Sequence, residues 1–358
     1  MKIVQIVTQM EAAGAQRVAY LLHDALHNRG HDTELWFLYL KRPAYIGKPG
    51  VRVLAGRRPS LPGRLLLAMK LFAWIRSCKP DVVITHTHYA NILGQLAAAF
   101  AGVRRRVAVH HSILTEYPAF ARYVDWLMGT LGVYTTQIAV SNSVVDSMLN
   151  YPRRYRSNVH TIYNGIALGR NSCLPSQRRA SVQANSPKIL HVGRLSPEKN
   201  HELLLKSLEQ LPGVSLVLVG DGELRDTLER QAEAMGLAGR VCFMGEVAAE
   251  NVRALMAACD LFMFPSAYEA MPMALLEAMA AGMPIVASDI PANRELLQDT
   301  GVLVPPDPKE LSCAAQQLLA DACSAKELGR RAAGRARKFS VETMLNGYES
   351  LLVPARPT

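Results

Sequence analysis

Short apolar runs that alternate with helical stretches constrain the fold of this chain more than any other feature. Residues 2–7 read KIVQIV, a run suited to a buried strand, and residues 15–26 then carry apolar side chains at helical spacing. The alternation continues through the first half and restarts after residue 187. Strands that alternate with helices form parallel sheets covered on both faces. We therefore expect an α/β protein with doubly wound sheets.

The predicted elements form two series. In the first series we expect strands at 2–7, 33–38, 81–85, 106–110 and 137–140, and helices at 15–26, 64–77, 89–101, 118–131 and 142–150. In the second series we expect strands at 188–192, 214–219, 241–243, 261–264 and 284–287, and helices at 200–209, 223–235, 249–257 and 273–281. Ligands of such sheets lie beyond the carboxyl ends of the strands. The residues that follow each strand are therefore the candidates for chemistry.

A segment without periodicity separates the two series. Residues 164–187 are rich in Ser, Asn, Pro and Arg and form the best linker candidate. At roughly 100–200 residues per domain, a chain of 358 residues suggests two domains. We assign residues 1–168 to a first domain, 169–187 to a linker, 188–340 to a second domain and 341–358 to a C-terminal segment.

Charge is spread unevenly between the halves. Residues 1–170 hold 21 Lys and Arg against 8 Asp and Glu, a net charge of +13, whereas residues 171–358 hold 19 against 22, a net charge of −3. A basic half indicates an anionic partner. Nucleic acid, an anionic membrane surface and a phosphorylated substrate are the candidates.

Several classes of protein are disfavoured by what the sequence lacks. No run reaches the roughly 18 uninterrupted apolar residues of a membrane span, and the start MKIVQIVTQMEAAG has no signal-peptide cleavage pattern. The six Cys are scattered without metal-ligand spacing. This pattern favours a reduced, cytoplasmic protein with structural thiols.

The most specific segment is PSAYEAMPMALLEAMAAGMPIVASD at 265–289. Glu269 lies in the loop after a predicted strand, and Glu277 follows eight residues later on a helix that Pro272 starts and Gly282 ends. The helix N-terminus can bind an anion such as a pyrophosphate, and the carboxylates can accept hydrogen bonds from sugar hydroxyls. The alternative is a capped helix with one buried Glu paired to Arg or Lys.

A second segment, ILHVGRLSPEKNH at 189–201, ends a predicted strand at Gly193. Glycine allows close approach of a ligand to the backbone, and the cations of Arg194 and Lys199 can neutralise a diphosphate leaving group. The alternative is an ordinary strand, turn and helix with two exposed cations.

Histidines follow two neighbouring strands of the first half. His110 and His111 end RVAVHH, and His86 and His88 end DVVITHTH. A loop histidine at the carboxyl end of a strand is a candidate active-site residue. No carboxylate or Cys joins these side chains at ligand spacing, so a metal site is disfavoured.

The loop EAAGAQR at 11–17 joins the first strand to the first helix. Its small residues, Gly14 among them, allow backbone N–H groups to approach a phosphate. It lacks a complete GxGxxG pattern, which disfavours a dehydrogenase. The later Gly-Asp-Gly at 220–222 is better interpreted as a turn than as a phosphate-binding loop.

The stretch RRPSLPGRLLLAMKLFAWIRSCK at 57–79 combines cations with large apolar residues. Arg57, Arg58, Arg64 and Trp74 are typical of a basic amphipathic helix in a membrane interface. The alternative is a core helix with a solvated basic face.

Together these segments resemble the retaining, nucleotide-sugar-dependent glycosyltransferases of family 4, of the kind that build bacterial surface polysaccharides. The resemblance covers nearly the whole chain and rests on the Glu-x7-Glu pair, on HVGRLSPEKN at 191–200, VGDGELR at 219–225 and YNGI at 163–166, and on the Gly14 loop, all in the family's order. It implies the GT-B fold, in which two Rossmann-like domains face each other across a cleft. It also implies that 341–353 forms a helix packed back toward the first, acceptor-side domain.

The resemblance also implies roles for individual residues. Arg194 and Lys199 would hold the donor diphosphate, Glu269 the transferred sugar, Glu277 the ribose, and His111, or else His110, would lie near the sugar. Backbone groups at Gly14, Gly193, Met271 and Met273 would contact phosphate or sugar. No metal or other cofactor is implied, since cations and a helix dipole take that part. Ala13 and Ala270 stand where many relatives have Gly.

The expected activity is transfer of a hexose or N-acetylhexosamine from a nucleotide-sugar, with UDP favoured over GDP. The expected acceptor is a glycan on a lipid diphosphate such as undecaprenyl diphosphate, which would bring the enzyme to the inner face of the cytoplasmic membrane. A nucleotide-sugar epimerase of the same fold is one alternative. A non-catalytic nucleic-acid-binding protein is another, although the basic residues lack regular aromatic interleaving.

Overall fold

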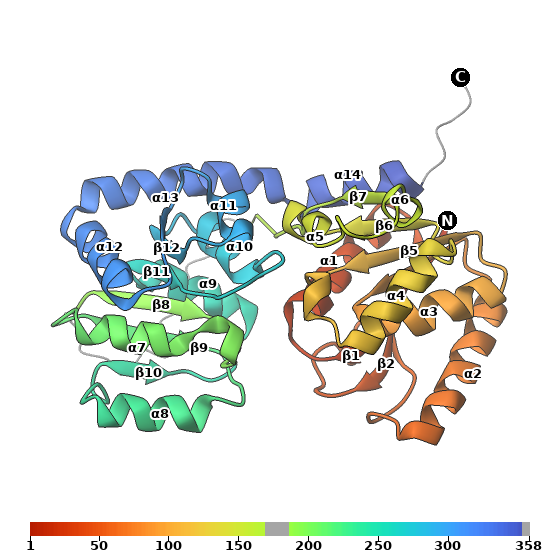
Figure 1. Ribbon diagram of the computed structural model, residues 1–358, viewed down its shortest axis with the longest axis horizontal. Coiled ribbons are helices and arrows are strands. Elements are labelled where there is room, and N and C mark those ends of the chain that lie inside the picture. The colour runs from red at the N-terminus through yellow and green to blue at the C-terminus, as the bar shows by residue number, and fades with distance from the viewer. Residues whose placement is uncertain (169–185, 353–358) are drawn as a thin grey trace. The chain divides into compact units, whose positions relative to one another are not determined.

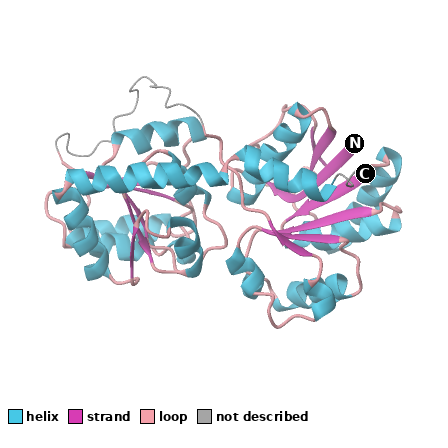
Figure 2. Ribbon diagram, turned by 90° about the horizontal axis from the view of Figure 1, so that it is seen from above, coloured by secondary structure: helices cyan, strands magenta, loops and turns pink. Residues whose placement is uncertain are grey.

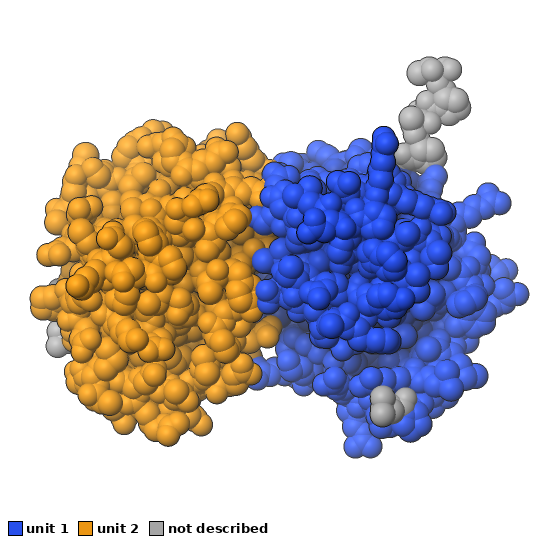
Figure 3. Space-filling view, viewed as in Figure 1, with its two compact units in different colours: residues 1–165, 340–358 blue, residues 166–339 orange. Residues whose placement is uncertain are grey.

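The structure is a computed structural model that describes residues 1–168 and 186–352. It divides into two compact units, drawn in different colours in Figure 3: unit 1 comprises Met1–Gly165 with Ser340–Thr358, and unit 2 comprises Ile166–Phe339. Most of the linker predicted over 169–187 lies outside the described residues. Each unit holds a parallel sheet with helices on both faces (Figure 2), which confirms the predicted fold class.

Unit 1 is built on a seven-stranded sheet in the order β3-β2-β1-β4-β5-β6-β7. Its strands are β1 (Lys2–Met10), β2 (Asp32–Leu40), β3 (Val51–Val53), β4 (Val82–His86), β5 (Arg105–His110), β6 (Thr136–Ala139) and β7 (Val159–Thr161). Its helices are α1 (Gly14–Asn28), α2 (Leu61–Cys78), α3 (His88–Phe100), α4 (Ala119–Thr130), α5 (Asn142–Asp146), α6 (Arg153–Arg156) and α14 (Val341–Leu352). The central strands are buried on both faces, which accounts for their nearly continuous apolar sequences.

The helices of unit 1 form two layers. Helices α2, α3 and α4 pack side by side (Figure 1), and right-handed crossovers place them on one face of the sheet. Helix α1 crosses on the opposite face and packs against α14. Since each of α1 to α4 follows a strand, the N-terminus of each lies toward the carboxyl edge of the sheet.

Unit 2 is built on a six-stranded sheet in the order β10-β9-β8-β11-β12-β13. Its strands are β8 (Lys188–Val192), β9 (Ser215–Val219), β10 (Val241–Phe243), β11 (Leu261–Phe264), β12 (Ile285–Ser288) and β13 (Val302–Val304). Its helices are α7 (His201–Glu209), α8 (Arg225–Ala234), α9 (Ala249–Ala258), α10 (Met273–Ala280), α11 (Pro291–Leu297), α12 (Pro308–Ala320) and α13 (Ala322–Ala336). Leucines of α7 and α12 form its core with strand residues such as Leu216 and Leu261.

The C-terminal helix α14 returns to unit 1. Arg29 of α1 pairs with Glu342 and with Glu349, and the Arg105 guanidinium donates to the backbone oxygen of Leu352. The buried side chain of Met344 also packs near the backbone of Gly165. Unit 1 is therefore completed by residues from both ends of the described chain.

Candidate functional site

Two loops at the carboxyl edge of the unit 2 sheet bring the predicted donor residues together. The loop after β11 carries Glu269, and the short 3-10 helix Pro197–Lys199 after β8 ends in Lys199. The Lys199 ammonium forms an ion pair with the Glu269 carboxylate. Their side chains are 18% and 12% exposed. The pair is thus held at the surface of the unit, within reach of a ligand.

The environment beneath Lys199 is aromatic and uncharged. Its Nζ lies 5.4 Å from the centre of the Phe264 ring, close enough for a cation–π interaction. The rings of His191 and His201 meet edge to face 4.7 Å apart nearby. Burial lowers the pKa of His201 to about 4, with Lys199 adding to the effect, and burial lowers the pKa of His191 as well. Both imidazoles are therefore neutral near pH 7, which leaves Lys199 as the local positive charge.

Helix α10 begins beside Glu269 without a side-chain cap. Its N-cap is Pro272, and Leu276 is the first residue whose N–H bonds back to an acceptor in the helix, the Pro272 oxygen at 3.2 Å. Met271 and Met273, on either side of Pro272, are both buried. An uncapped helix N-terminus favours an anion.

Gly193 and Gly220 allow two loops to pack against each other. A Cβ at Gly193 would lie 2.9 Å from His191 Nε2, and a Cβ at Gly220, whose φ is +131°, would lie 1.9 Å from the Gly193 oxygen. The backbone N–H of Leu195 donates to the backbone oxygen of Asp221 at 3.1 Å. The Gly-Asp-Gly segment therefore supports the backbone that carries Arg194. The Arg194 side chain is exposed at this edge.

Glu277 lies inside α10 and is half-buried. Since α10 starts at Met273, Glu277 is one turn into the helix. The structure thus places Glu269 before the helix and Glu277 within it, on one continuous segment.

In unit 1, the structure distinguishes the two adjacent histidines at the end of β5. His110 is fully buried, with its ring nitrogens 3.4 Å from the Tyr117 hydroxyl and 3.2 Å from Gln137 Oε1. His111 is half-buried on the loop that follows, and its Nε2 lies 2.9 Å from Nδ1 of the buried His86. His111 is therefore the histidine that can meet a ligand.

Two further features mark this edge of unit 1. Thr87, directly after β4, has a φ of +73°, a strained conformation for a β-branched residue and one typical of functional sites. Helix α1 starts at the exposed Gly14, and its N-cap Ala13 offers no side-chain hydrogen bond. The first N–H groups of α1 are consequently available to an anion.

Helix α2 combines a core face with an exposed face. Leu67, Leu71 and Ile75 are buried. Trp74 packs with them, edge-on to Trp36 at 5.6 Å. Trp74, expected at the membrane surface, is partly buried against the core, so only part of its ring is exposed there.

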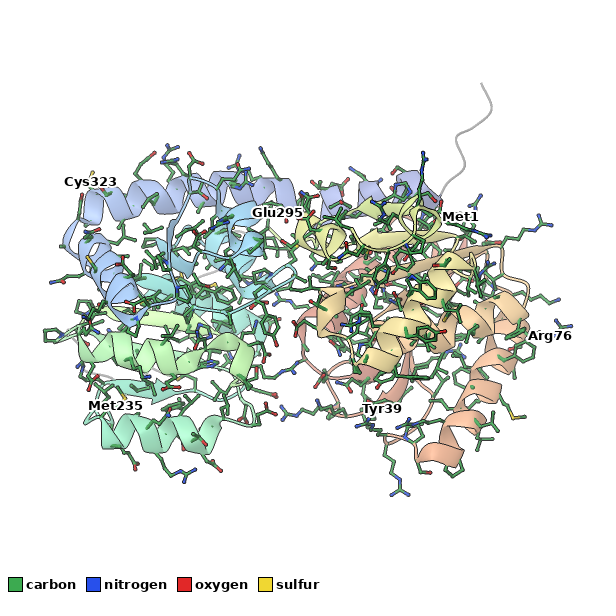
Figure 4. All side chains as sticks on the ribbon, in the orientation of Figure 1. Met1, Tyr39, Arg76, Met235, Glu295 and Cys323 are labelled. Atoms are coloured by element: carbon green, nitrogen blue, oxygen red, sulfur yellow. The ribbon has the colours of Figure 1, made fainter. Side chains whose placement is uncertain are left out.

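The expected cations are exposed on α2 and on the loop before it. Arg57 and Arg58 lie in that loop, and Arg64 and Arg76 lie on the helix (Figure 4). Leu65, Leu66 and Met69 are each more than 60% exposed. The helix therefore satisfies part of each interpretation of its sequence, with one face in the core and a basic, apolar face in solvent.

Exposed apolar residues continue across the neighbouring helices. Nine of the thirteen large hydrophobic side chains that are exposed in the described ranges lie on or directly after α2, α3 and α4. They are Leu65, Leu66, Met69, Tyr89, Phe100, Phe120, Tyr123, Leu127 and Leu131. An apolar surface of this extent indicates a partner surface.

The described part of the chain holds no group of three or more His, Cys, Asp or Glu side chains placed to bind a metal. Within the same residues, no helix has the length and apolar character needed to span a bilayer.

Some site residues were not predicted from the sequence. Phe264, His191 and His201 lie under Lys199, and Gln5 lies behind His86. Gln5 did leave a signal, because it is the single polar residue within the buried run IVQIV at 3–7.

Two family models match the chain in succession. Residues 12–170 match "Glycosyltransferase Family 4", and residues 175–338 match "Glycosyl transferases group 1". A lipopolysaccharide core biosynthesis glycosyltransferase of Rhizobium meliloti is 29% identical over 81% of this chain and 80% of its own length. UDP-Gal:alpha-D-GlcNAc-diphosphoundecaprenol alpha-1,3-galactosyltransferase of Escherichia coli is 27% identical over 64% of this chain and 63% of its own length.

Solved structures share the fold. HepE of Anabaena, crystallised with UDP and glucose, superposes with a TM-score of 0.87 at 24% identity, covering 98% of this chain and 99% of that chain. The sucrose-phosphate synthase of Thermosynechococcus elongatus gives a TM-score of 0.81 at 21% identity, over 98% of each chain.

Proposed function

Since this chain belongs to the family 4 glycosyltransferases of the GT-B fold, we propose that it is a retaining hexosyltransferase that uses a UDP-sugar donor. The Lys199–Glu269 pair before the uncapped N-terminus of α10 carries the proposal. A cation and a helix dipole suit a diphosphate, and a carboxylate suits sugar hydroxyls. Arg194 supplies a second cation, Glu277 binds the ribose, and backbone groups of Gly193, Met271, Met273 and Gly14 contact phosphate or sugar.

We favour UDP over GDP as the nucleotide of the donor because two relatives are named for, or crystallised with, UDP or a UDP-sugar. The Escherichia coli relative is named for a UDP-galactose donor, and the crystallised HepE holds UDP. The transferred group is a hexose or N-acetylhexosamine.

The reaction proceeds through an oxocarbenium-like transition state. The bond from the anomeric carbon to the phosphate oxygen breaks, and its electron pair leaves with the diphosphate, which Lys199, Arg194 and the α10 N-terminus stabilise. The acceptor hydroxyl attacks the same face, so the configuration is retained, and its proton passes to the departing phosphate oxygen. No covalent nucleophile is assigned.

The acceptor we propose is a glycan on a lipid diphosphate, used to build a surface polysaccharide. The exposed apolar residues of α2, α3 and α4 and the cations Arg57, Arg58 and Arg64 suit an anionic membrane surface. A relative named for a diphosphoundecaprenol acceptor supports the same choice. The enzyme would then work as a peripheral protein at the cytoplasmic face of the membrane.

A ligand screen tests the donor. Thermal shifts are measured with UDP, GDP, ADP and their sugars, since a ligand at about 100 times its dissociation constant stabilises a protein by about 2.7 kcal/mol. We expect the largest shift with UDP or a UDP-sugar, and a much smaller shift in Lys199→Ala. A larger shift with GDP would refute the nucleotide, and interconversion of the sugar without acceptor would indicate an epimerase.

A further inference from the structure

Gln5, at the centre of β1, is a fully buried amide whose orientation is fixed by the backbone of α1. One end of the amide lies 3.0 Å from the His23 backbone N–H, and the other lies 3.2 Å from the Ala19 carbonyl oxygen. An N–H only donates and a carbonyl only accepts. The amide oxygen of Gln5 therefore faces His23, and its nitrogen faces Ala19.

The same amide nitrogen lies 2.9 Å from Nε2 of His86. Because the amide nitrogen donates, His86 Nε2 accepts, and the proton of the neutral His86 ring is on Nδ1. His86 is fully buried, and burial, followed by the nearby His111, lowers its pKa well below the usual value. The ring is therefore uncharged, and its tautomer is set from behind by Gln5.

The His86 ring passes this constraint on to His111. His86 Nδ1 lies 2.9 Å from His111 Nε2, so Nδ1 donates and Nε2 accepts. Burial, followed by the neighbouring His110, lowers the pKa of His111 to about 3, so this ring is neutral as well. Its proton is then on Nδ1, which has no hydrogen-bond partner among the described residues.

We propose that Gln5 and His86 are positioning residues that fix the tautomer of His111, so that His111 presents an N–H donor to an oxygen of the substrate. The inference rests on the proposed function, in which His111 lies near the transferred sugar. A sugar hydroxyl and a phosphate oxygen both offer the lone pair that this donor requires. A ring fixed in this way does not take the proton of the acceptor hydroxyl, which leaves that proton to the departing phosphate.

The adjacent histidine provides an internal contrast. Gln137 donates from Nε2 to the backbone oxygen of Tyr155 at 2.8 Å. Its Oε1 therefore faces His110 Nε2 at 3.2 Å and accepts a hydrogen bond from it. His110 therefore carries its proton on Nε2 and accepts from the Tyr117 hydroxyl on Nδ1. Two neighbouring histidines are thus fixed in opposite tautomers, each by a glutamine on a strand, and only His111 reaches solvent.

The first test reads the tautomers in the wild-type protein. Protonated and unprotonated ring nitrogens have well-separated ¹⁵N chemical shifts, so spectra of ¹⁵N-histidine-labelled protein assign each proton. Signals of His111 are identified by their loss in His111→Ala. We expect His111 with Nδ1 protonated and His110 with Nε2 protonated near pH 7. A His111 protonated on Nε2 would overturn the proposal without reference to activity.

The second test reverses the constraint with Gln5→Glu. A carboxylate only accepts, so His86 must donate to it from Nε2, and the proton of His111 moves to Nε2. We expect the ¹⁵N shifts to report the proton on Nε2 instead of Nδ1 in both His86 and His111. We also expect kcat to fall by about tenfold, which is the effect of one lost hydrogen bond. Gln137→Glu is the matched control, because it buries the same group beside His110, and it should leave the His111 signals and kcat near those of the wild type.

A third pair of variants covers the case in which Gln5→Glu fails to fold. His86→Phe removes the donor to His111, and His86→Gln restores an amide N–H, so we expect kcat to fall in the first and recover in part in the second. Equal kcat values in these two variants would overturn the positioning role. A normal kcat in His111→Ala would instead overturn the role of His111 in the proposed function, and absence of sugar transfer by the wild type would overturn that function itself.

Discussion

Units 1 and 2 share the parallel α/β plan but differ in charge and surface. Unit 1 carries a net charge of +11 and unit 2 a net charge of −1. Of the thirteen exposed large hydrophobic side chains in the described ranges, eleven belong to unit 1. Both sheet edges carry an ion pair, Lys199–Glu269 in unit 2 and Lys41–Glu11 in unit 1, but the edge of unit 1 adds the buried hydrogen-bonded pair His86 and His111. The difference is what the proposed function requires, in which unit 2 binds a small, charged donor and unit 1 a larger and partly apolar acceptor.

The largest expected effect tests the role of unit 2. Lys199→Ala and Glu269→Ala should each lower turnover by roughly 10²–10³-fold, because a charged contact to the leaving group or sugar contributes about 2.7–4 kcal/mol to the transition state. The measurement is kcat with a UDP-sugar and a lipid-diphosphate glycan. Lys206→Ala is the matched control, since Lys206 forms a surface pair with Glu202 on α7. Near-normal kcat in both site variants would remove the donor site from unit 2.

The second prediction tests the surface of unit 1. Arg57, Arg58 and Arg64 replaced together by Glu should weaken binding to anionic vesicles by about 100-fold, since each cation near such a surface contributes about 1 kcal/mol at best. Co-sedimentation at low and high salt measures it. Lys206, Arg230 and Lys326, all exposed in unit 2, replaced together by Glu provide the control for net charge. Equal losses in the two triple variants, or no binding by the wild type at low salt, would favour a water-soluble acceptor.

The third prediction is that acid destabilises unit 1 before unit 2. The pKa is lowered by burial at His23, His86, His88 and His111 in unit 1, but only at His191 and His201 in unit 2. These rings are neutral when folded, so below their unfolded pKa of about 6.5 the unfolded chain binds more protons. The free energy of unfolding then falls by about 1.4 kcal/mol per pH unit for each ring, until the folded pKa is reached at about 3 for His111 and about 4 for His201.

Tryptophan fluorescence separates the two units in this experiment. All three Trp residues, at 36, 74 and 126, belong to unit 1, whereas circular dichroism reports on both units. As the pH falls from 7 toward 4, the change in tryptophan fluorescence should occur at a higher pH than the pH at which half of the helical circular dichroism signal is lost. A fluorescence change at the lower pH would contradict the prediction that unit 1 unfolds first.

The smallest expected effect concerns helix caps. Asp321 caps α13 by accepting from the N–H groups of Cys323 and Ser324, so Asp321→Ala should destabilise unit 2 by about 1 kcal/mol. Ala13→Asp should instead stabilise α1, while its carboxylate occupies the N–H groups proposed to bind the ligand. Denaturant unfolding and the KM for the donor measure the two effects. A stabilised Ala13→Asp variant with unchanged KM would exclude the start of α1 from the site.

The sequence predicted the central strands and one edge strand, β10, but missed the other three edge strands. VVI of β4 and LFMF of β11 are continuous apolar runs, and both strands were found. The edge strands β3, β7 and β13 have three residues each, too few for a period to show, and β10, of the same length, was found from the apolar residues Val241 and Phe243 and its place between two predicted helices. The helix expected over 142–150 ends at Asp146, four residues early.

The site was predictable only where its residues lie in local motifs. Glu269 and Lys199 each follow a strand in a recognisable segment, but their pairing joins positions 70 residues apart. The chain of hydrogen bonds from Gln5 through His86 to His111 depends on β1, β4 and β5 being close neighbours in the sheet. The partial burial of Trp74 was not predicted because α2 has apolar residues around its whole circumference, so spacing alone does not identify the buried side.

Helix α14 also sets the order in which the chain matures during translation. Unit 2 is encoded between two parts of unit 1, and its residues have all left the ribosome before the segment Val341–Leu352 does. Until then α1 lacks the carboxylates of Glu342 and Glu349, and Arg105 lacks its acceptor at Leu352. The α14-binding surface of α1 is therefore without its partner in the nascent protein until the whole of unit 2 has been synthesised.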